Sequence, residues 1–154
     1  MVGKTIESET ISENYASKNF ELNGYQLAPK ISYLFSRNAS WDLFYEYQDK
    51  KNQINDLETL QQHRFGTSFT YNSEAKLTMN GEFSLYQNDF VGDELSPVAY
   101  QMLEGLQAGQ NLTWRLLIQK NLTQYLDVNV NYQGRKSEES KTIHTGSVQL
   151  RAYF

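Results

Sequence analysis

The chain has 154 residues, a formal net charge of −4 at pH 7 and no cysteine. The composition therefore excludes disulfides and thiolate chemistry, and the acidic balance provides no basic surface for nucleic acid. No stretch approaches the roughly 20 apolar residues that a membrane-spanning helix needs. Aromatic residues make up 14% of a chain whose mean hydropathy is −0.65, which predicts strands with one aromatic face and one polar face.

Residues 1 to 23 form a polar N-terminal segment. Residues 5 to 11 offer no continuous apolar face, and Phe20 and Leu22 alternate with polar neighbours only briefly. We expect the remnant of a loop here, with a weak strand as the alternative. The first seven residues also lack the apolar region of a secretory signal, so we expect either a removed signal or a fragment.

Residues 24 to 154 contain seven segments in which apolar and polar residues alternate. A period of two predicts β-strands with one apolar and one polar face. The segments cover residues 25 to 35, 41 to 48, 64 to 71, 75 to 85, 111 to 119, 126 to 133 and 145 to 154. Pro29 lies in the first of them and lacks a backbone N–H, which predicts a strand start, a bulge or an edge there.

Short and long connections alternate along this series. The short ones are residues 36 to 40, 72 to 74 and 120 to 123, and the long ones are residues 49 to 60, 87 to 106 and 135 to 140. Tight periplasmic turns and long extracellular loops alternate in this way in outer-membrane β-barrels. The pattern predicts an all-β fold of antiparallel, up-and-down transmembrane barrel strands in meander order, with seven clear strands and an eighth as the alternative.

Whether the number of predicted strands is odd or even indicates whether the chain forms a complete barrel. Bacterial barrels have an even number of strands, whereas seven strands would make the first one begin on the extracellular side. We therefore expect the C-terminal part of a larger barrel, in which residues 1 to 23 are an extracellular loop remnant. A complete eight-strand barrel with a poor first strand is the alternative.

The polar positions of these alternating segments include charged residues of both signs near the middle of the strands. Such residues could line a lumen and pair across strands. These lumen-facing candidates are Lys30, Asp42, Glu46, Arg64, Lys76, Glu82, Arg115, Asp127 and Arg151. Aromatic residues gather near strand ends, as expected for girdles at two membrane interfaces. The girdle candidates are Phe35, Trp41, Tyr47, Tyr71, Trp114 and Tyr132.

Few residues could carry catalytic chemistry. The two histidines, His63 and His144, fall on the apolar parity, which favours interfacial or loop positions over a Ser/His or Asp/His site. No His, Asp or Glu spacing indicates a metal site. The acidic residues between positions 89 and 94 lack the ligand spacing of a calcium loop, so we interpret them as part of a solvated loop. We expect no catalytic residue, no metal and no cofactor.

The segment from Val98 to Leu106 is the apolar part of the longest loop. It could form a short helix or fold back over the barrel mouth. The segment could contact a ligand or a partner, or it could simply pack on neighbouring loops, and the sequence does not decide between these two roles. The contact candidates are Val98, Tyr100, Met102 and Leu103.

The end of the chain resembles the C-terminal assembly signal of outer-membrane barrels, in which alternating apolar residues precede a terminal aromatic. The matching residues are Val148, Leu150, Ala152, Tyr153 and Phe154. Residues 96 to 106, 134 to 137 and 143 to 146 also resemble the C-terminal region of large outer-membrane and cell-surface proteins of the Bacteroidota. The resemblance covers residues 25 to 154. It implies the Gram-negative outer membrane as the location, but no activity and no catalytic residues.

The expected partners are membrane lipid, lipopolysaccharide, the barrel-assembly machinery, and the remaining strands or other subunits of a larger complex. The expected function is non-enzymatic: the C-terminal wall of a barrel that serves transport, secretion or surface anchoring. A soluble β-sandwich or calycin-like binding module would show the same alternation with its apolar face turned inward. An outer-membrane hydrolase is a weaker alternative.

Overall fold

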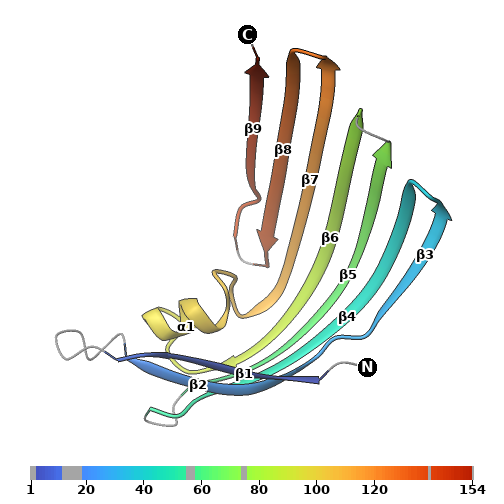
Figure 1. Cartoon of the computed structure of the whole chain (residues 1–154). Helices are drawn as coiled ribbons and strands as arrows, with labels where there is room; N and C mark the ends of the chain where they lie inside the picture. Colours follow the sequence, from blue (N-terminus) through green and yellow to red (C-terminus); the bar gives the residue numbers. More distant parts are fainter. Residues whose placement is uncertain (1–2, 12–18, 55–57, 74–75, 139, 154) are drawn as a thin grey trace. The chain divides into compact units, whose positions relative to one another are not determined.

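The computed structural model describes residues 3 to 11, 19 to 54, 58 to 73, 76 to 138 and 140 to 153. These residues form nine strands and one short helix (Figure 1). The elements are β1 (Gly3–Thr10), β2 (Phe20–Leu27), β3 (Lys30–Ser36), β4 (Ala39–Asn52), β5 (Thr59–Ser73), β6 (Leu77–Val91), α1 (Pro97–Met102), β7 (Gly109–Thr123), β8 (Leu126–Ser137) and β9 (Ile143–Ala152). Over these residues, no helix is both long enough and apolar enough to cross a membrane.

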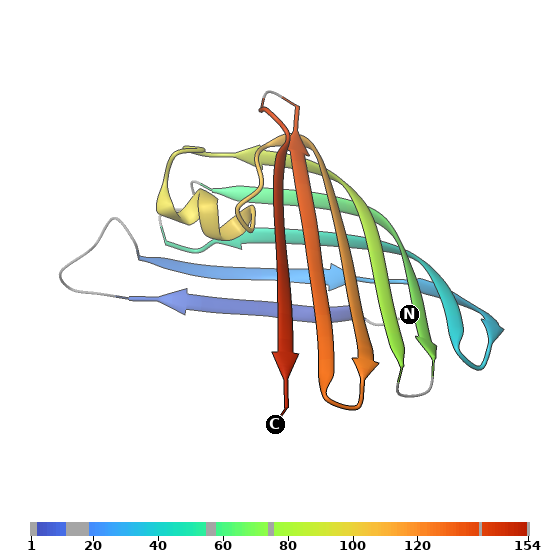
Figure 2. The same cartoon turned by 90° about the horizontal axis from the view of Figure 1, so that it is seen from above.

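All nine strands belong to one sheet, in the order β1-β2-β4-β5-β6-β7-β8-β9, with β3 pairing to β4 beside this path. Apart from the step from β2 to β4, neighbours on this path are consecutive along the chain, as the colours in Figure 2 indicate. The predicted all-β fold with antiparallel strands in meander order is therefore confirmed. The path has eight strands, with β1 and β9 at its two ends.

The first predicted strand, residues 25 to 35, is two strands in the structure. β2 pairs with Tyr47 to Asn52 of β4, and β3 pairs with Ala39 to Phe44. Pro29 lies between them and has no N–H for the ladder, although its carbonyl oxygen accepts a hydrogen bond from Tyr45 N at 3.1 Å. The option of a strand start next to the proline is the correct one.

A strand also lies within the segment of residues 1 to 23, where the sequence favours a loop. β1 pairs with β2 over eight positions, from Gly3 opposite Leu27 to Thr10 opposite Phe20. An edge strand needs only the backbone ladder to one neighbour, so polar residues such as Lys4, Thr5 and Glu7 can form it with exposed side chains. The loop expectation is wrong for these residues.

Several strands run further than the alternation of apolar residues indicates. β4 to β7 have 14 or 15 residues each. β7 continues through residues 120 to 123, which the sequence assigns to a turn, and the turn lies at Gln124 and Tyr125. Backbone hydrogen bonds extend the ladder past the apolar band because they do not depend on side-chain type. The alternation of short and long connections is unaffected.

The chain divides into two compact units, which are described separately. Unit 1 comprises Met1–Pro29, Tyr45–Arg64 and Tyr86–Asn111, and unit 2 comprises Lys30–Phe44, Phe65–Leu85 and Leu112–Phe154. The buried hydrophobic side chains of the described residues all lie in unit 1: Leu22, Leu60, Val98, Ala99, Met102 and Leu103. Phe20 and Phe90 pack against this cluster.

Helix α1 covers part of this cluster in unit 1, so the short helix, one of the two options that the sequence left open for this segment, is present. Ser96 caps it, because its side-chain oxygen accepts a hydrogen bond from Ala99 N at 3.0 Å. Pro97 follows at the first turn, where its missing N–H removes no helical hydrogen bond. The helix ends near Glu104, whose φ of 57° lies in the left-handed region.

Candidate functional site: the two faces of the sheet

Two strands of unit 2, β4 and β6, show an inverted pattern of burial. In β4, Trp41 and Leu43 are 41% and 46% exposed, whereas Asp42 between them is 9% exposed. In β6, Phe83 and Leu85 are exposed, whereas Ser84 between them is fully buried. Proteins that fold in water normally bury the apolar face of a sheet. In β4 and β6 the polar residue is covered and its apolar neighbours are open.

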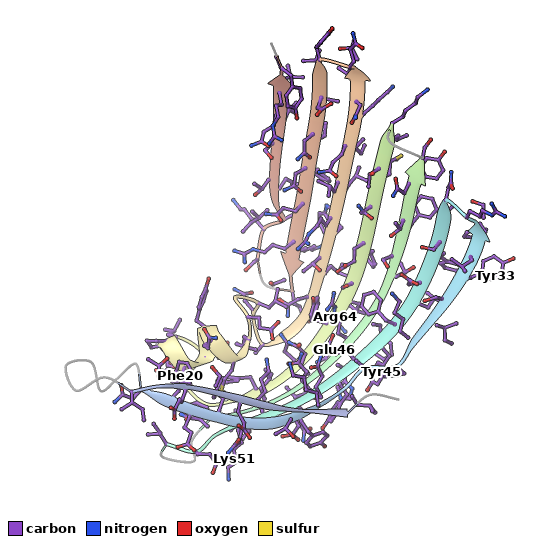
Figure 3. The ribbon with its side chains drawn as sticks, in the orientation of Figure 1. Phe20, Tyr33, Tyr45, Glu46, Lys51 and Arg64 are labelled. Carbon is purple, nitrogen blue, oxygen red and sulfur yellow. The ribbon has the colours of Figure 1, made fainter. Side chains whose placement is uncertain are left out.

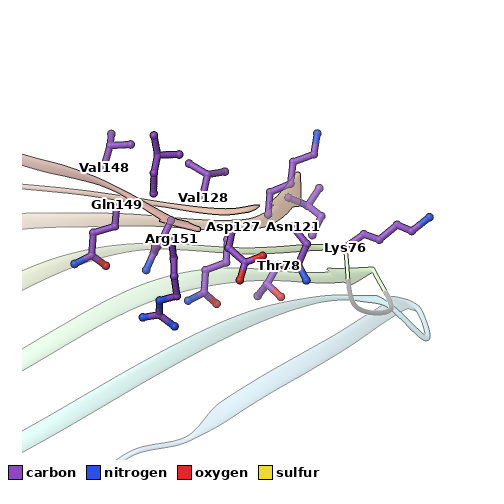
Figure 4. Close-up of a pocket in the computed structure, with 13 residues that line it drawn as sticks. Lys76, Thr78, Asn121, Asp127, Val128, Val148, Gln149 and Arg151 are labelled. Carbon is purple, nitrogen blue, oxygen red and sulfur yellow. The ribbon is translucent and has the colours of Figure 1, made fainter. Parts of the chain in front are cut away.

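The same apolar face continues over the other strands of unit 2. Its exposed large hydrophobic residues include Ile31, Tyr33, Phe35, Trp41, Leu43, Phe65, Phe69, Phe83, Leu85, Val148 and Leu150. Figure 4 shows the alternation on β8 and β9: Val128 and Val148 project to one side, and Asp127, Gln149 and Arg151 project to the other. Val128 lies opposite Leu150 in the register, so apolar residues meet apolar residues across the strands.

The polar face brings several of the predicted lumen-facing charges into pairs. In unit 2, Lys30 Nζ lies 2.9 Å from Asp42 Oδ2, and Ser68 Oγ donates a hydrogen bond to the same carboxylate. Asp127 lies directly opposite Arg151 in the register of β8 and β9. Such cross-strand pairs satisfy the charges on a covered face.

In unit 1 the polar face is organised around Glu46. Its carboxylate accepts hydrogen bonds from the side-chain amides of Gln26 and Gln48 and lies 3.3 Å from Arg64 Nη1. The guanidinium of Arg64 also lies 5.3 Å from the centre of the Tyr86 ring. Figure 3 labels Glu46 and Arg64 on their strands. The sequence identified both charges but not the two glutamines that complete the cluster.

The remaining predicted charges are more exposed. Arg115 is exposed on β7, and Glu82 is partly buried on β6. Lys76 precedes β6 rather than lying within it, and its backbone N–H donates to the carbonyl oxygen of Ser73. Lys76 therefore belongs to a turn, which corrects its predicted position within a strand.

The loop that carries α1 folds onto the polar face of unit 1. Leu60 shares its strand parity with Gln62 and Arg64, and its side chain joins the buried cluster under the helix. Of the four contact candidates, Val98, Met102 and Leu103 are buried in that cluster, and Tyr100 is 71% exposed. Packing therefore accounts for three of the four candidates.

Polar contacts fix the same loop. Gln62 Nε2 donates to Asn88 Oδ1, and Asn88 Nδ2 donates in turn to the carbonyl oxygen of Gln107. Asn111 Nδ2 donates to the same carbonyl, and Asn111 Oδ1 accepts from Gln107 N. The buried amides thus satisfy the loop backbone, as buried polar groups require.

Lys50 joins the loop to β4. Its side chain is buried, and Nζ lies 2.7 Å from Glu104 Oε1 and 3.3 Å from the carbonyl oxygen of Met102. Glu104 is 53% exposed, so water can solvate its carboxylate, whereas the ammonium of Lys50 depends on these two contacts. The ion pair is therefore energetically asymmetric.

This asymmetry predicts different effects for the two single substitutions. Glu104→Gln should destabilise unit 1 by about 1–3 kcal/mol, because it leaves a buried ammonium without a counter-charge. Lys50→Met should cost less than about 1 kcal/mol, because the remaining carboxylate is solvated and the replacement is apolar. Urea unfolding of both variants under identical conditions measures the difference. A larger loss for Lys50→Met would contradict the asymmetry.

Aromatic residues on the apolar face form two clusters that each contain one of the histidines. In unit 1, Tyr45 Oη lies 2.8 Å from His63 Nδ1, and the Tyr47 ring lies 4.9 Å from the His63 ring. In unit 2, Tyr132 Oη lies 2.8 Å from His144 Nδ1. Sequence parity places both histidines on this face but does not reveal their tyrosine partners.

The other girdle candidates lie on the same apolar parity. Trp41 Nε1 donates to Thr67 Oγ1, and the Phe35 ring packs edge-on against Tyr33 at 4.9 Å. Tyr71 is partly buried on β5. At the end of the chain, Val148, Leu150, Ala152 and Tyr153 are exposed, and Phe154 lies outside the described residues.

A groove of about 780 Å³ lies among β6, β7, β8 and β9 in unit 2 (Figure 4). Thr78, Gln119, Asp127, Asn129, Gln149 and Arg151 supply much of its polar lining. Tyr153 Oη donates to Asp127 at 3.1 Å, and the buried Oδ1 atom of Asn129 has no hydrogen-bond partner among the described residues. The groove can contact polar solutes, and nothing in it resembles a catalytic arrangement.

Within the part of the chain that the structure describes, no three His, Cys, Asp or Glu residues come together as a metal site. No family model, no curated protein and no solved structure matches the chain.

Proposed function

We propose that this chain forms the wall of a β-barrel in a bacterial outer membrane, with its apolar face toward lipid and its polar face toward a lumen. The observation that carries the proposal is the inverted burial in β4 and β6 of unit 2, where, for example, Trp41 and Leu43 are open and Asp42 is covered. The role is non-enzymatic and serves transport, secretion or surface anchoring.

The exposed apolar face requires an apolar surrounding. Removing apolar surface from water contributes about 25 cal/mol per Å², and eleven large hydrophobic residues of unit 2 present such surface on one face. A soluble β-sandwich would cover them with a second sheet. The described residues form a single sheet, and their one helix packs in unit 1. Lipid is the cover that matches this arrangement.

Strand length supports the same proposal. A tilted strand crosses a bilayer with about 9–11 residues, and β4 to β7 have 14 or 15 residues each. The excess allows each strand to extend beyond the hydrocarbon region. Soluble strands typically have about five or six residues.

The polar face suits contact with water or polar solutes. Several of its charges are paired, as for Lys30 with Asp42 and Arg64 with Glu46. In this proposal the α1 loop, which is anchored to Lys50 in unit 1, occupies part of the lumen side.

Detergent dependence tests the proposal. The purified chain should show cooperative unfolding by circular dichroism, and should be monodisperse, only when detergent micelles or lipid vesicles are present. A folded, monomeric chain in detergent-free buffer would contradict the membrane assignment and favour a soluble binding module instead.

A further inference from the structure

Three aromatic side chains from three strands meet on the apolar face of unit 2. The ring centres of Trp114 and His144 lie 5.7 Å apart, and the Tyr132 and His144 rings stack at 6.0 Å with an interplanar angle of 12°. Trp114 Nε1 donates to Tyr132 Oη at 3.3 Å. We call Trp114, Tyr132 and His144 the aromatic patch.

The backbone of β8 makes room for this patch. A Cβ atom built on Gly134 would lie 2.3 Å from atoms of the Trp114 indole, so no larger residue fits there without moving the ring. Gly134 also lies directly opposite His144 in the register. The indole therefore lies over Gly134, next to the histidine, and the patch is a fixed arrangement of three strands.

The hydrogen bonds of the patch leave a donor available. A tryptophan N–H can only donate, so Tyr132 Oη accepts from Trp114. If the Trp114 N–H and the Tyr132 O–H both donate within the patch, the Tyr132 O–H donates to His144 Nδ1. Neutral His144 in this arrangement carries its proton on Nε2, where it can donate to a ligand.

The patch lies between a cation and an apolar surface. Lys136 is exposed and shares the parity of Tyr132 and Gly134 on β8, so it is the next residue of this face toward the long loop. In the other direction the register pairs Val130 with Val148 and Val128 with Leu150. The order along the face is cation, aromatic patch, aliphatic surface.

We propose that this surface binds a lipid that carries an anionic phosphate headgroup. The headgroup contacts Lys136 and the Nε2–H of His144, the Trp114 ring lies at the level of the glycerol backbone, and the acyl chains follow the aliphatic surface formed by Val130, Val148 and Leu150. The charge and the order of groups match such a lipid from end to end. The inference rests on the proposed membrane location.

Brominated lipids test this inference, because bromine quenches tryptophan fluorescence at short range. The chain has two tryptophans, so the Trp41→Phe background leaves Trp114 as the only reporter. Vesicles contain either brominated phosphatidylglycerol or brominated phosphatidylcholine at equal mole fraction. Quenching of Trp114 should be stronger with the anionic lipid.

In this background the double variant Lys136→Gln/His144→Gln should abolish the preference for the anionic lipid. A residue charge near an anionic surface contributes about 1 kcal/mol, which corresponds to about a fivefold preference. Lys76→Gln, at the short-turn end of β6 in the same unit, is the matched control and should retain the preference.

Two outcomes separate this inference from the proposed function. Equal quenching by both lipids, or a preference that survives the double variant, would overturn the lipid site while leaving the membrane location intact. Failure of the chain to float with vesicles in a density gradient would overturn the proposed function itself, and the lipid site with it. Circular dichroism of each variant in vesicles confirms that it is folded.

Discussion

Leu150→Arg is expected to destabilise the folded chain in lipid vesicles by about 2–4 kcal/mol, the cost of a cation near the middle of a membrane on the lipid-facing side of a barrel. Leu150 lies on β9, is 68% exposed and faces the same side as Val128, its register partner. Its surroundings on that face are aliphatic, so no nearby carboxylate offsets the new charge. Urea unfolding in vesicles measures the change.

Gln149→Arg is the matched control because it changes the adjacent residue to the same side chain. Gln149 faces the polar side with Asp127 and Arg151, as Figure 4 shows. A cation there meets water and a carboxylate, so the stability should change by less than about 1 kcal/mol. Equal effects at positions 149 and 150 would mean that the two faces do not differ in their surroundings.

Gly24→Ala is expected to destabilise unit 1 by about 1–3 kcal/mol, or more where the strands cannot adjust. A Cβ atom at position 24 would lie 2.0 Å from the carbonyl oxygen of Asp49 and 3.0 Å from Lys50 Cα. Both are backbone atoms of β4, so no side-chain rotation can relieve the overlap. β2 would have to move away from β4, which would also disturb Lys50 and its contacts to the α1 loop.

Gly81→Ala on β6 is the control for this substitution. A Cβ atom at position 81 meets nothing within 4 Å. The substitution should be neutral or slightly stabilising, because alanine reduces the conformational entropy of the unfolded chain. Thermal and urea unfolding of the two variants, side by side, provide the comparison. Similar losses at both sites would show that the close approach of β2 to β4 is not maintained.

The fold was largely predictable because the alternation of apolar and polar residues is strict. In β4 the sequence alone separates Trp41 and Leu43 from Asp42, and the structure places them on opposite faces. The short helix was also predictable, since Ser96 and Pro97 are typical start signals before an apolar segment. The strand Gly3–Thr10 was not, because an exposed edge strand carries no pattern of burial.

The candidate site was predictable only in part, because contacts between strands depend on their register. Glu46 and Arg64 both carry the polar parity, but the hydrogen bonds from Gln26 and Gln48 follow from the pairing of β2 with β4. The Tyr132–His144 pair likewise joins residues 12 positions apart on two strands. Alternation assigns the face, and the register assigns the neighbour.

The buried cluster of unit 1 has a weaker sequence signal. Leu60 is on the same side of β5 as polar residues such as Gln62 and Arg64. It is therefore an apolar exception on the polar face. Such an exception marks a place where another apolar segment can pack, and Val98 and Met102 of the α1 loop fill this role. An apolar residue on the polar parity is therefore informative about loop packing.

The central claim, that the apolar face contacts lipid and the polar face contacts water, can be measured directly with single spin labels. The chain has no cysteine, so Val128→Cys and Asn129→Cys each provide one labelling site on β8. In vesicles, the label at position 128 should be relaxed mainly by oxygen, which concentrates in lipid, and the label at position 129 mainly by a water-soluble nickel complex. High accessibility of position 128 to the nickel complex, equal to that of position 129, would contradict the account.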